Sequence, residues 1–118
     1  MDNEEFKAMC LQAIANLEAQ GMQSKVGSSC RYLAFPGACC IVGHMMPDDE
    51  TREAADRNIN NGGTSIASLY KQGFEWVQQF DKEQLNLLTM LQHIHDESTT
   101  PITFSFGIRN MLRLVEDL

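Results

Sequence analysis

Apolar residues recur at intervals of three and four positions in three stretches of the chain, which is the spacing of one face of an α-helix. This pattern predicts helices over residues 2–21, from 81 to about 97, and from 100 to the end of the chain. The short loop between the last two helices predicts that they pack antiparallel. The predicted buried faces are Phe6, Met9, Cys10, Ala13, Ile14 and Leu17 in the first helix, Leu87, Leu88, Leu91 and Ile94 in the second, and Phe104, Ile108, Met111, Leu112, Val115 and Leu118 in the third.

The residues at the ends of these helices agree with the apolar spacing. An acidic or hydroxyl side chain precedes each helix and can accept hydrogen bonds from its free backbone N–H groups. Gly21 suits the end of the first helix, because glycine adopts the left-handed conformation at little cost. The predicted N-terminal caps are Asp2 with Glu5, Asp81 with Gln84, and Thr100 before Pro101.

Shorter helices are predicted in the middle of the chain. One runs from residue 48 to 58, has only alanines as apolar residues, and should therefore be exposed or weakly held. Its carboxylates lack the ligand spacing of a calcium loop, so we interpret them as the solvated start of a helix. A second helix spans 64–73, with Ile66, Leu69 and Tyr70 facing inward, and an aromatic segment at 74–80 favours a third. The Asn-Asn-Gly-Gly stretch at 60–63 predicts a loop.

Residues 30–46 predict the β-structure of the chain. The runs Cys30–Phe35 and Ala38–Met46 suit short strands, and Pro36-Gly37 between them is typical of a turn. We therefore expect an α+β fold with four to five helices packed on a small antiparallel β-hairpin. A chain of 118 residues is long enough to bury its own core, which predicts a single globular domain over 1–118.

The charge and apolar content of the chain limit the kinds of molecule that it is expected to bind. The formal net charge is −7, and the nine basic residues form no stripe, so the electrostatic footprint of a nucleic-acid-binding protein is missing. An acidic surface instead favours basic protein partners. No apolar run reaches the roughly 18 residues of a membrane span, and the acidic N-terminus does not match an export signal. We expect a cytoplasmic protein whose thiols are kept reduced.

Zinc binding is the first chemical hypothesis. Cys30, Cys40 and His44 gather around the predicted turn and could supply thiolate and imidazole ligands, with His95 from a distant helix as the fourth. Their spacing matches no compact zinc motif. On a strand, Cys40 and His44 would lie about 13 Å apart unless Gly43 bends the chain. Buried thiols that only fill the core are the alternative interpretation.

A nucleophilic cysteine is the second hypothesis. Cys30 or Cys40 would need an adjacent base, for which His95 is the natural candidate. His95 falls on the apolar face of its predicted helix. Asp96 follows it directly and should point about 100° away around the helix, so we do not expect this carboxylate to orient the imidazole. An inward histidine more often satisfies a backbone carbonyl or the end of a helix.

A series of short motifs resembles a known group of proteins. The series is similar to that of small, largely uncharacterised bacteriophage and prophage proteins, which look like an N-terminal helix, a cysteine-bearing hairpin and a Leu-Gln-x-x-His-Asp helix. Two departures are Cys39 directly before Cys40 and a long Asn-Gly loop after the hairpin. Position 44 is histidine here, where relatives often carry cysteine or another residue. The resemblance implies no particular chemistry, because the group has no common activity. The motifs are Cys30-x-Tyr32, Gly37, Cys40-Ile41-Val42-Gly43, Met46-Pro47-Asp48 and Leu91-Gln92-x-x-His95-Asp96.

The resemblance, small size, acidity and missing catalytic motifs together predict a non-enzymatic phage or prophage accessory protein. It would bind a host protein or a small signalling molecule in the bacterial cytoplasm and inhibit host antiviral defence, as a protein inhibitor or a small-molecule sponge. The candidate ligand-binding residues lie beside the predicted contact between hairpin and helix: Arg31, Tyr32, His95 and Asp96. Two alternatives remain open, a small zinc- or ligand-binding domain and a thiol-dependent enzyme. Self-association stays open, and no cofactor is expected apart from zinc in the first alternative.

Overall fold

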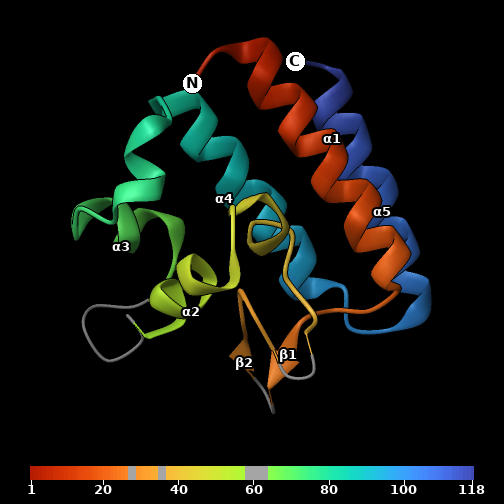
Figure 1. The fold of residues 1–118 in the computed structure, drawn as a ribbon. Coiled ribbons are helices and arrows are strands. Elements are labelled where there is room, and N and C mark those ends of the chain that lie inside the picture. The colour runs from red at the N-terminus through yellow and green to blue at the C-terminus, as the bar shows by residue number, and fades with distance from the viewer. Residues whose placement is uncertain (27–28, 35–36, 58–63) are drawn as a thin grey trace.

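The fold in the computed structural model is built mainly from helices (Figure 1). The structure describes residues 1–26, 29–34, 37–57 and 64–118. The predicted 60–63 loop, Phe35 and Pro36 lie outside these residues. Among the described helices, none combines the length and the apolar character needed to cross a membrane. The helices are α1 (Asn3–Gln20), α2 (Asp49–Arg57), α3 (Ile66–Lys71), α4 (Lys82–Glu97) and α5 (Pro101–Glu116), together with the 3-10 turns η1 (Gly43–Met45) and η3 (Glu75–Gln79).

The three long helices form the frame. Helix α5 packs against both α1 and α4, and it runs antiparallel to each, so that the beginning of α1 and the end of α5 meet (Figure 1). The side chain of Lys7 donates to the carbonyl of Glu116 at 3.3 Å across this meeting point. The large apolar side chains that are fully buried in the frame are Phe6, Ile14, Leu17, Leu88, Leu91, Met111 and Val115.

The predicted helix ends are confirmed where the structure describes their side chains. Asp81 and Gln84 form a reciprocal capping box at the start of α4, and Thr100 caps α5 directly before Pro101. Asp2 accepts from two backbone N–H groups of the first turn of α1. Gly21 ends that helix at φ 76°, in the left-handed region. Local hydrogen-bond chemistry thus sets where the long helices begin and end.

The predicted α+β fold with a β-hairpin is wrong, because the fold is helical. The second predicted strand, Ala38–Met46, instead forms turns and η1. Backbone N–H groups of His44 and Met45 donate to the carbonyls of Cys40 and Val42, as in a helical turn. Four consecutive residues, 39–42, are all buried, and such a continuous apolar run does not by itself distinguish a strand from a buried turn.

Strand pairing in the described residues is limited to short pieces. β1 (Lys25–Val26) and β2 (Ser29–Cys30) pair antiparallel over two residues each. The first predicted strand, Cys30–Phe35, overlaps this pairing only at Cys30, and its predicted partner, Ala38–Met46, does not take part in it. A single bridge joins Ala34 and Ala38 around Gly37, which has φ 136°. The chain therefore turns near the predicted position but does not continue as a hairpin.

Two side chains predicted to face inward are instead exposed. Tyr70 is 43% exposed and Leu118 is 56% exposed. Both stand at the ends of their apolar stripes, where neighbouring elements no longer cover the helix. The short helix α2, expected to be exposed or weakly held, buries Ala55 completely. The spacing of apolar positions therefore predicts which face of a helix turns toward the core, but not how far along the helix that face is covered.

Replacing Gly43 by alanine tests the packing of η1. A Cβ at this position would collide with the backbone carbonyl oxygen of Tyr32, which cannot move without shifting its whole segment. We expect Gly43→Ala to lower the free energy of unfolding by about 1–3 kcal/mol, as overpacking does. Urea denaturation measures this loss, with Glu18→Ala on the exposed side of α1 as the control. Equal stability of the two variants would contradict the close approach of η1 to Tyr32.

Candidate functional site

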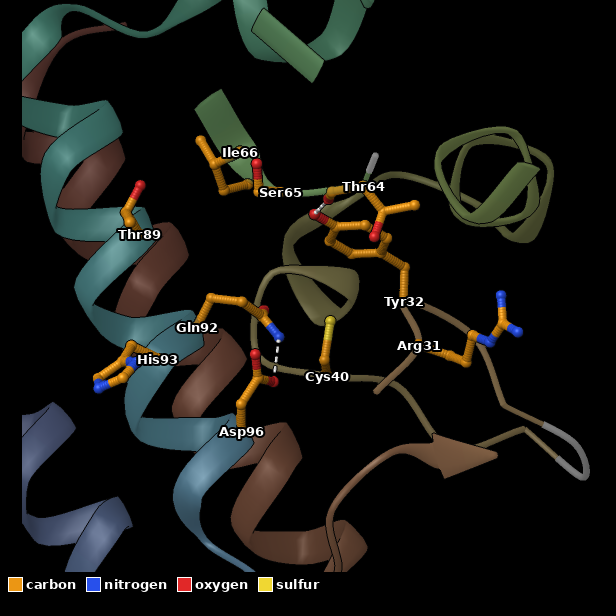
Figure 2. A pocket seen from close by; sticks show the side chains of 10 residues that line it. All are labelled: Arg31, Tyr32, Cys40, Thr64, Ser65, Ile66, Thr89, Gln92, His93 and Asp96. Carbon is orange, nitrogen blue, oxygen red and sulfur yellow. Dashed lines mark hydrogen bonds between the residues drawn. The ribbon is translucent and has the colours of Figure 1, made fainter. Parts of the chain in front are cut away.

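A pocket of about 290 Å³ lies between α4, the segment around Tyr32 and the start of α3 (Figure 2). One wall comes from α4, where the polar residues stand at intervals of three and four and so share one helix face. These residues are Thr89, Gln92, His93 and Asp96. The facing side is formed by Arg31, Tyr32, Cys40, Thr64, Ser65 and Ile66.

A buried histidine supports the α4 wall from behind. The side chain of His95 is completely buried, and its Nε2 accepts a hydrogen bond from the backbone N–H of Ser24 at 3.1 Å. Because Nε2 acts as an acceptor, the hydrogen-bond network assigns the proton to Nδ1. Nδ1 then donates to Oδ1 of Asp96 at 3.0 Å. The imidazole thus connects the segment after α1 to the carboxylate in the pocket wall.

The expectation that Asp96 would not orient His95 is wrong. Their Cα–Cβ bonds do point in different directions around α4, but the carboxylate folds back toward the ring, and Gln92 donates to the same Oδ1 at 3.0 Å. Figure 2 shows the amide of Gln92 and the carboxylate of Asp96 turned toward each other, with the Cys40 sulfur nearby. Two donors on one helix therefore fix the position of this carboxylate.

Gln23 holds the end of α4 in place. Its side-chain amide donates to the carbonyls of His95 and Asp96, both at 2.9 Å. Carbonyls in the last turn of a helix lack the usual partner four residues on, and Gln23 supplies a donor to both of these, in addition to the N–H of Ser98 that also donates to the carbonyl of His95. Together with Ser24, Gln23 clamps α4 beside the pocket. The sequence gives no signal for Gln23 or Ser24, since both look like residues of an ordinary polar connection.

A carboxylate from α2 positions the opposite side of the pocket. The two oxygens of Asp56 accept from the backbone N–H groups of Tyr32 and Leu33, at 2.9 and 3.0 Å. The hydroxyl of Tyr32 donates to the carbonyl of Thr64. Burial raises the pKa of Tyr32 well above its usual value, and Cys40, Asp56 and Asp96 add to the rise. Tyr32 is therefore a neutral, fixed wall of the pocket.

The four predicted ligand-binding residues lie in one region. Arg31, Tyr32 and Asp96 line the pocket, whereas His95 lies behind Asp96 and does not line it. In Figure 2 the guanidinium of Arg31 points away from Gln92 and Asp96, which places it at the edge of the pocket. Gln92, Thr89 and Ser65 were not predicted. Thr89 and Gln92 share the polar spacing along α4, which any solvated helix face also shows, and Gln92 stands in the Leu-Gln-x-x-His-Asp motif. Ser65 is the N-terminal cap of α3 and lies outside α4.

The structure describes the side chains of some, but not all, of the predicted zinc ligands. Cys40 is buried, and its sulfur accepts from the backbone N–H of Gly43 at 3.3 Å. Nε2 of His44 lies 2.8 Å from the amide oxygen of Gln20. The side chain of Cys30 lies outside the described part of the structure. Among the residues that are described, no three His, Cys, Asp or Glu side chains gather as a metal site. Zinc binding stays a prediction.

The geometry gives a cysteine nucleophile little support. Burial raises the pKa of Cys40 far above its usual value, and the hydrogen bond from Gly43 only partly opposes this rise. The side chain is therefore a thiol near neutral pH, and the thiolate is the reactive form. Nε2 of His95 already accepts from Ser24, and its Nδ1 is bonded to Asp96. Neither nitrogen is in position to take a proton from a thiol.

Comparison with known proteins adds no relative. No protein-family model, no curated protein and no solved structure matches this chain. The resemblance to phage and prophage proteins therefore stays a prediction carried by its motifs, and function has to be argued from the chemistry of the site.

Replacing His95 tests the buried network. In His95→Leu the backbone N–H of Ser24 loses its acceptor, and we expect the free energy of unfolding to fall by about 1–3 kcal/mol. His95→Gln places an amide oxygen near the position of Nε2 and should lose less. His93→Gln, at an exposed position of the same helix, is the matched control and should change stability by less than about 0.5 kcal/mol. Urea unfolding of the three variants measures the difference. A His95→Leu protein as stable as the control would contradict the network.

Thiol alkylation tests the burial of the cysteines. Burial raises the pKa of Cys10 from 9.0 to about 12, so near pH 8 the folded protein holds about 1000-fold less thiolate at this position than the unfolded chain. The pKa of Cys40 also rises. We expect iodoacetamide to modify both slowly in the native protein and rapidly in urea, as followed by peptide mass spectrometry. Modification of native Cys40 at the rate of the unfolded chain would show that its thiol is open to solvent.

Proposed function

We propose that this protein is a non-enzymatic binding protein that retains a small polar molecule in the pocket beside α4. The observation that carries this proposal is the α4 wall, in which Gln92 and Asp96 are fixed by hydrogen bonds within the protein. Side chains held in place in this way lose little conformational freedom when a ligand binds, which favours affinity.

The lining indicates the chemistry of the ligand. The carboxylate of Asp96 accepts hydrogen bonds, the hydroxyls of Thr89 and Ser65 both donate and accept, and Arg31 offers a cation at the edge. A matching molecule carries hydrogen-bond donors on the side that faces Asp96 and an acceptor or anionic group toward Arg31. A volume of about 290 Å³ suits a small metabolite rather than a peptide.

The state of the reactive side chains supports binding rather than catalysis. Cys40 lines the pocket as a buried thiol, and both nitrogens of His95 have partners within the protein. Tyr32 is held neutral and bonded to Thr64. The groups nearest the ligand would thus orient it without exchanging protons with it.

The resemblance to phage and prophage proteins supports a biological role for this retention. In that role the bound molecule belongs to the bacterial host, and the protein acts in the bacterial cytoplasm as a small-molecule sponge. Removal of a signalling molecule from solution would inhibit a host antiviral defence that depends on it. The pocket supports the small-molecule form of the proposal over inhibition through a protein interface alone.

Equilibrium dialysis tests the proposal directly. The purified protein, free of any affinity tag, is dialysed against a bacterial metabolite extract, and the retained molecules are identified by mass spectrometry. We expect the native protein to retain a small polar compound. Asp96→Asn removes the charge that faces the ligand and should weaken retention about tenfold or more, as the loss of a charged hydrogen bond does.

The matched control is Asn86→Ala, which changes an exposed residue of α4 that does not line this pocket. Its retention should equal that of the native protein, and thermal unfolding verifies that both variants are folded. If the native protein and Asp96→Asn retain the same compounds in equal amounts, or if neither retains any, the pocket is not a binding site and the proposal fails.

A further inference from the structure

A second groove, of about 560 Å³, lies between α2 and η3 and has a different chemistry. Its apolar surface is supplied by two elements that are distant in sequence, with aromatic rings on the η3 side. Carboxylates lie on both sides of it. The lining residues are Pro47, Asp48, Glu50, Thr51, Ala54, Phe74, Glu75, Trp76 and Gln79.

The aromatic side of the groove is anchored in the core. Trp76 is half-buried and packs edge-on against Phe80, with ring centroids 5.0 Å apart. Phe80 in turn packs against Phe6 of α1, with centroids 5.8 Å apart. Phe80 and Phe6 are buried, so this row of rings holds Trp76 in one position while part of its surface faces the groove. A fixed tryptophan at the surface is typical of a residue that contributes strongly to protein binding.

The charged side chains that line the groove are all carboxylates. Asp48, Glu50 and Glu75 are exposed, and no lysine, arginine or histidine is found among the described residues that line the groove. Hydrogen bonds from the hydroxyl and the backbone N–H of Thr51 lower the pKa of Asp48, which keeps it ionised. Arg52, the nearest cation along α2, donates to the carbonyls of Gly43 and Met46 and to Asp49.

The geometry points to a docking site for a lysine- or arginine-bearing segment of a partner protein in the groove between α2 and η3. The aliphatic stem or guanidinium of one basic residue would lie over Trp76, where the face of the indole attracts a cation. Its charged group, and that of a neighbouring basic residue, would reach the carboxylates of Glu75 and of Asp48 or Glu50. A segment suits the groove better than a single small cation, because the carboxylates come from two separate elements. This site shares no lining residue with the pocket beside α4.

The fluorescence of Trp76 provides a direct test, because it is the only tryptophan of the chain. The probe is the acetylated and amidated hexapeptide Lys-Leu-Lys-Arg-Leu-Lys, titrated at low and at physiological salt. We expect a saturable change in Trp76 fluorescence and an affinity that weakens as salt increases. The same peptide with glutamate at every basic position should produce no change.

Two triple variants separate the groove from the general charge of the protein. The groove variant carries Asp48→Asn, Glu50→Gln and Glu75→Gln. The control carries Glu18→Gln, Glu83→Gln and Glu97→Gln, which are exposed residues outside the groove and change the net charge by the same amount. We expect the groove variant to bind a fluorescein-labelled copy of the peptide about tenfold more weakly, and the control about as well as the native protein.

Each contrary result overturns the proposal in a distinct way. Equal weakening in both variants would show that only the net charge attracts the peptide. An unchanged Trp76 signal at saturating peptide, as judged by the labelled copy, would place the peptide elsewhere on the protein. If spermidine displaces the peptide at an equal concentration, the groove is a site for a small polyamine and not for a protein segment. No binding of the peptide at low salt would remove the site altogether.

Discussion

The structure depends on one requirement, namely that the largely buried segment comprising residues 31–34 and 38–46 must find hydrogen-bond partners for its backbone outside any sheet. Buried N–H and C=O groups are costly when they are left unpaired. Side chains from α1 and α2 supply partners to this segment. Asp56 of α2 bonds the N–H groups of Tyr32 and Leu33, Gln20 of α1 bonds both backbone groups of Cys39, and Arg52 of α2 bonds the carbonyls of Gly43 and Met46. The segment is therefore held by polar contacts with the helices around it.

The same requirement builds the pocket. Tyr32 is a fixed wall because Asp56 holds its backbone and Thr64 accepts from its hydroxyl. On the other side, the buried imidazole of His95 needs a partner for each nitrogen, and it finds them in Ser24 and Asp96. The carboxylate that faces the pocket is thus one end of a chain of bonds that begins in the core. The same residues stabilise the fold and shape the pocket. The stability of the protein is enough to explain how His95 is placed. A binding role for Asp96 is shown only by a change in ligand retention when Asp96 is replaced.

The features that could be predicted from the sequence are those whose interacting residues lie close together along the chain. The three long helices were predicted because their caps and apolar spacing are local, as at Asp81 with Gln84 and at Thr100. The hairpin was predicted wrongly because the four buried residues 39–42 fit a strand and a turn equally well. Asp56 lies 24 positions from its partner Tyr32, and Ser24 lies 71 positions from its partner His95, so no local sequence pattern predicts these contacts. Arg31, Tyr32 and Asp96 were chosen because they lie beside the predicted contact between hairpin and helix, and the fold brings them to one pocket without testing whether they bind a ligand.

Helix α2 connects the two surfaces argued above. It buries little apolar surface, with Ala55 as its completely buried residue, and is held instead through Arg52 and Asp56. Asp56 supports Tyr32 in the pocket, while the preceding turns of the same helix line the groove beside Trp76. A ligand at one site changes affinity at the other only if it favours one placement of α2 over another. Because polar contacts rather than a large apolar face set that placement, α2 is the element through which the two sites of this small protein would communicate.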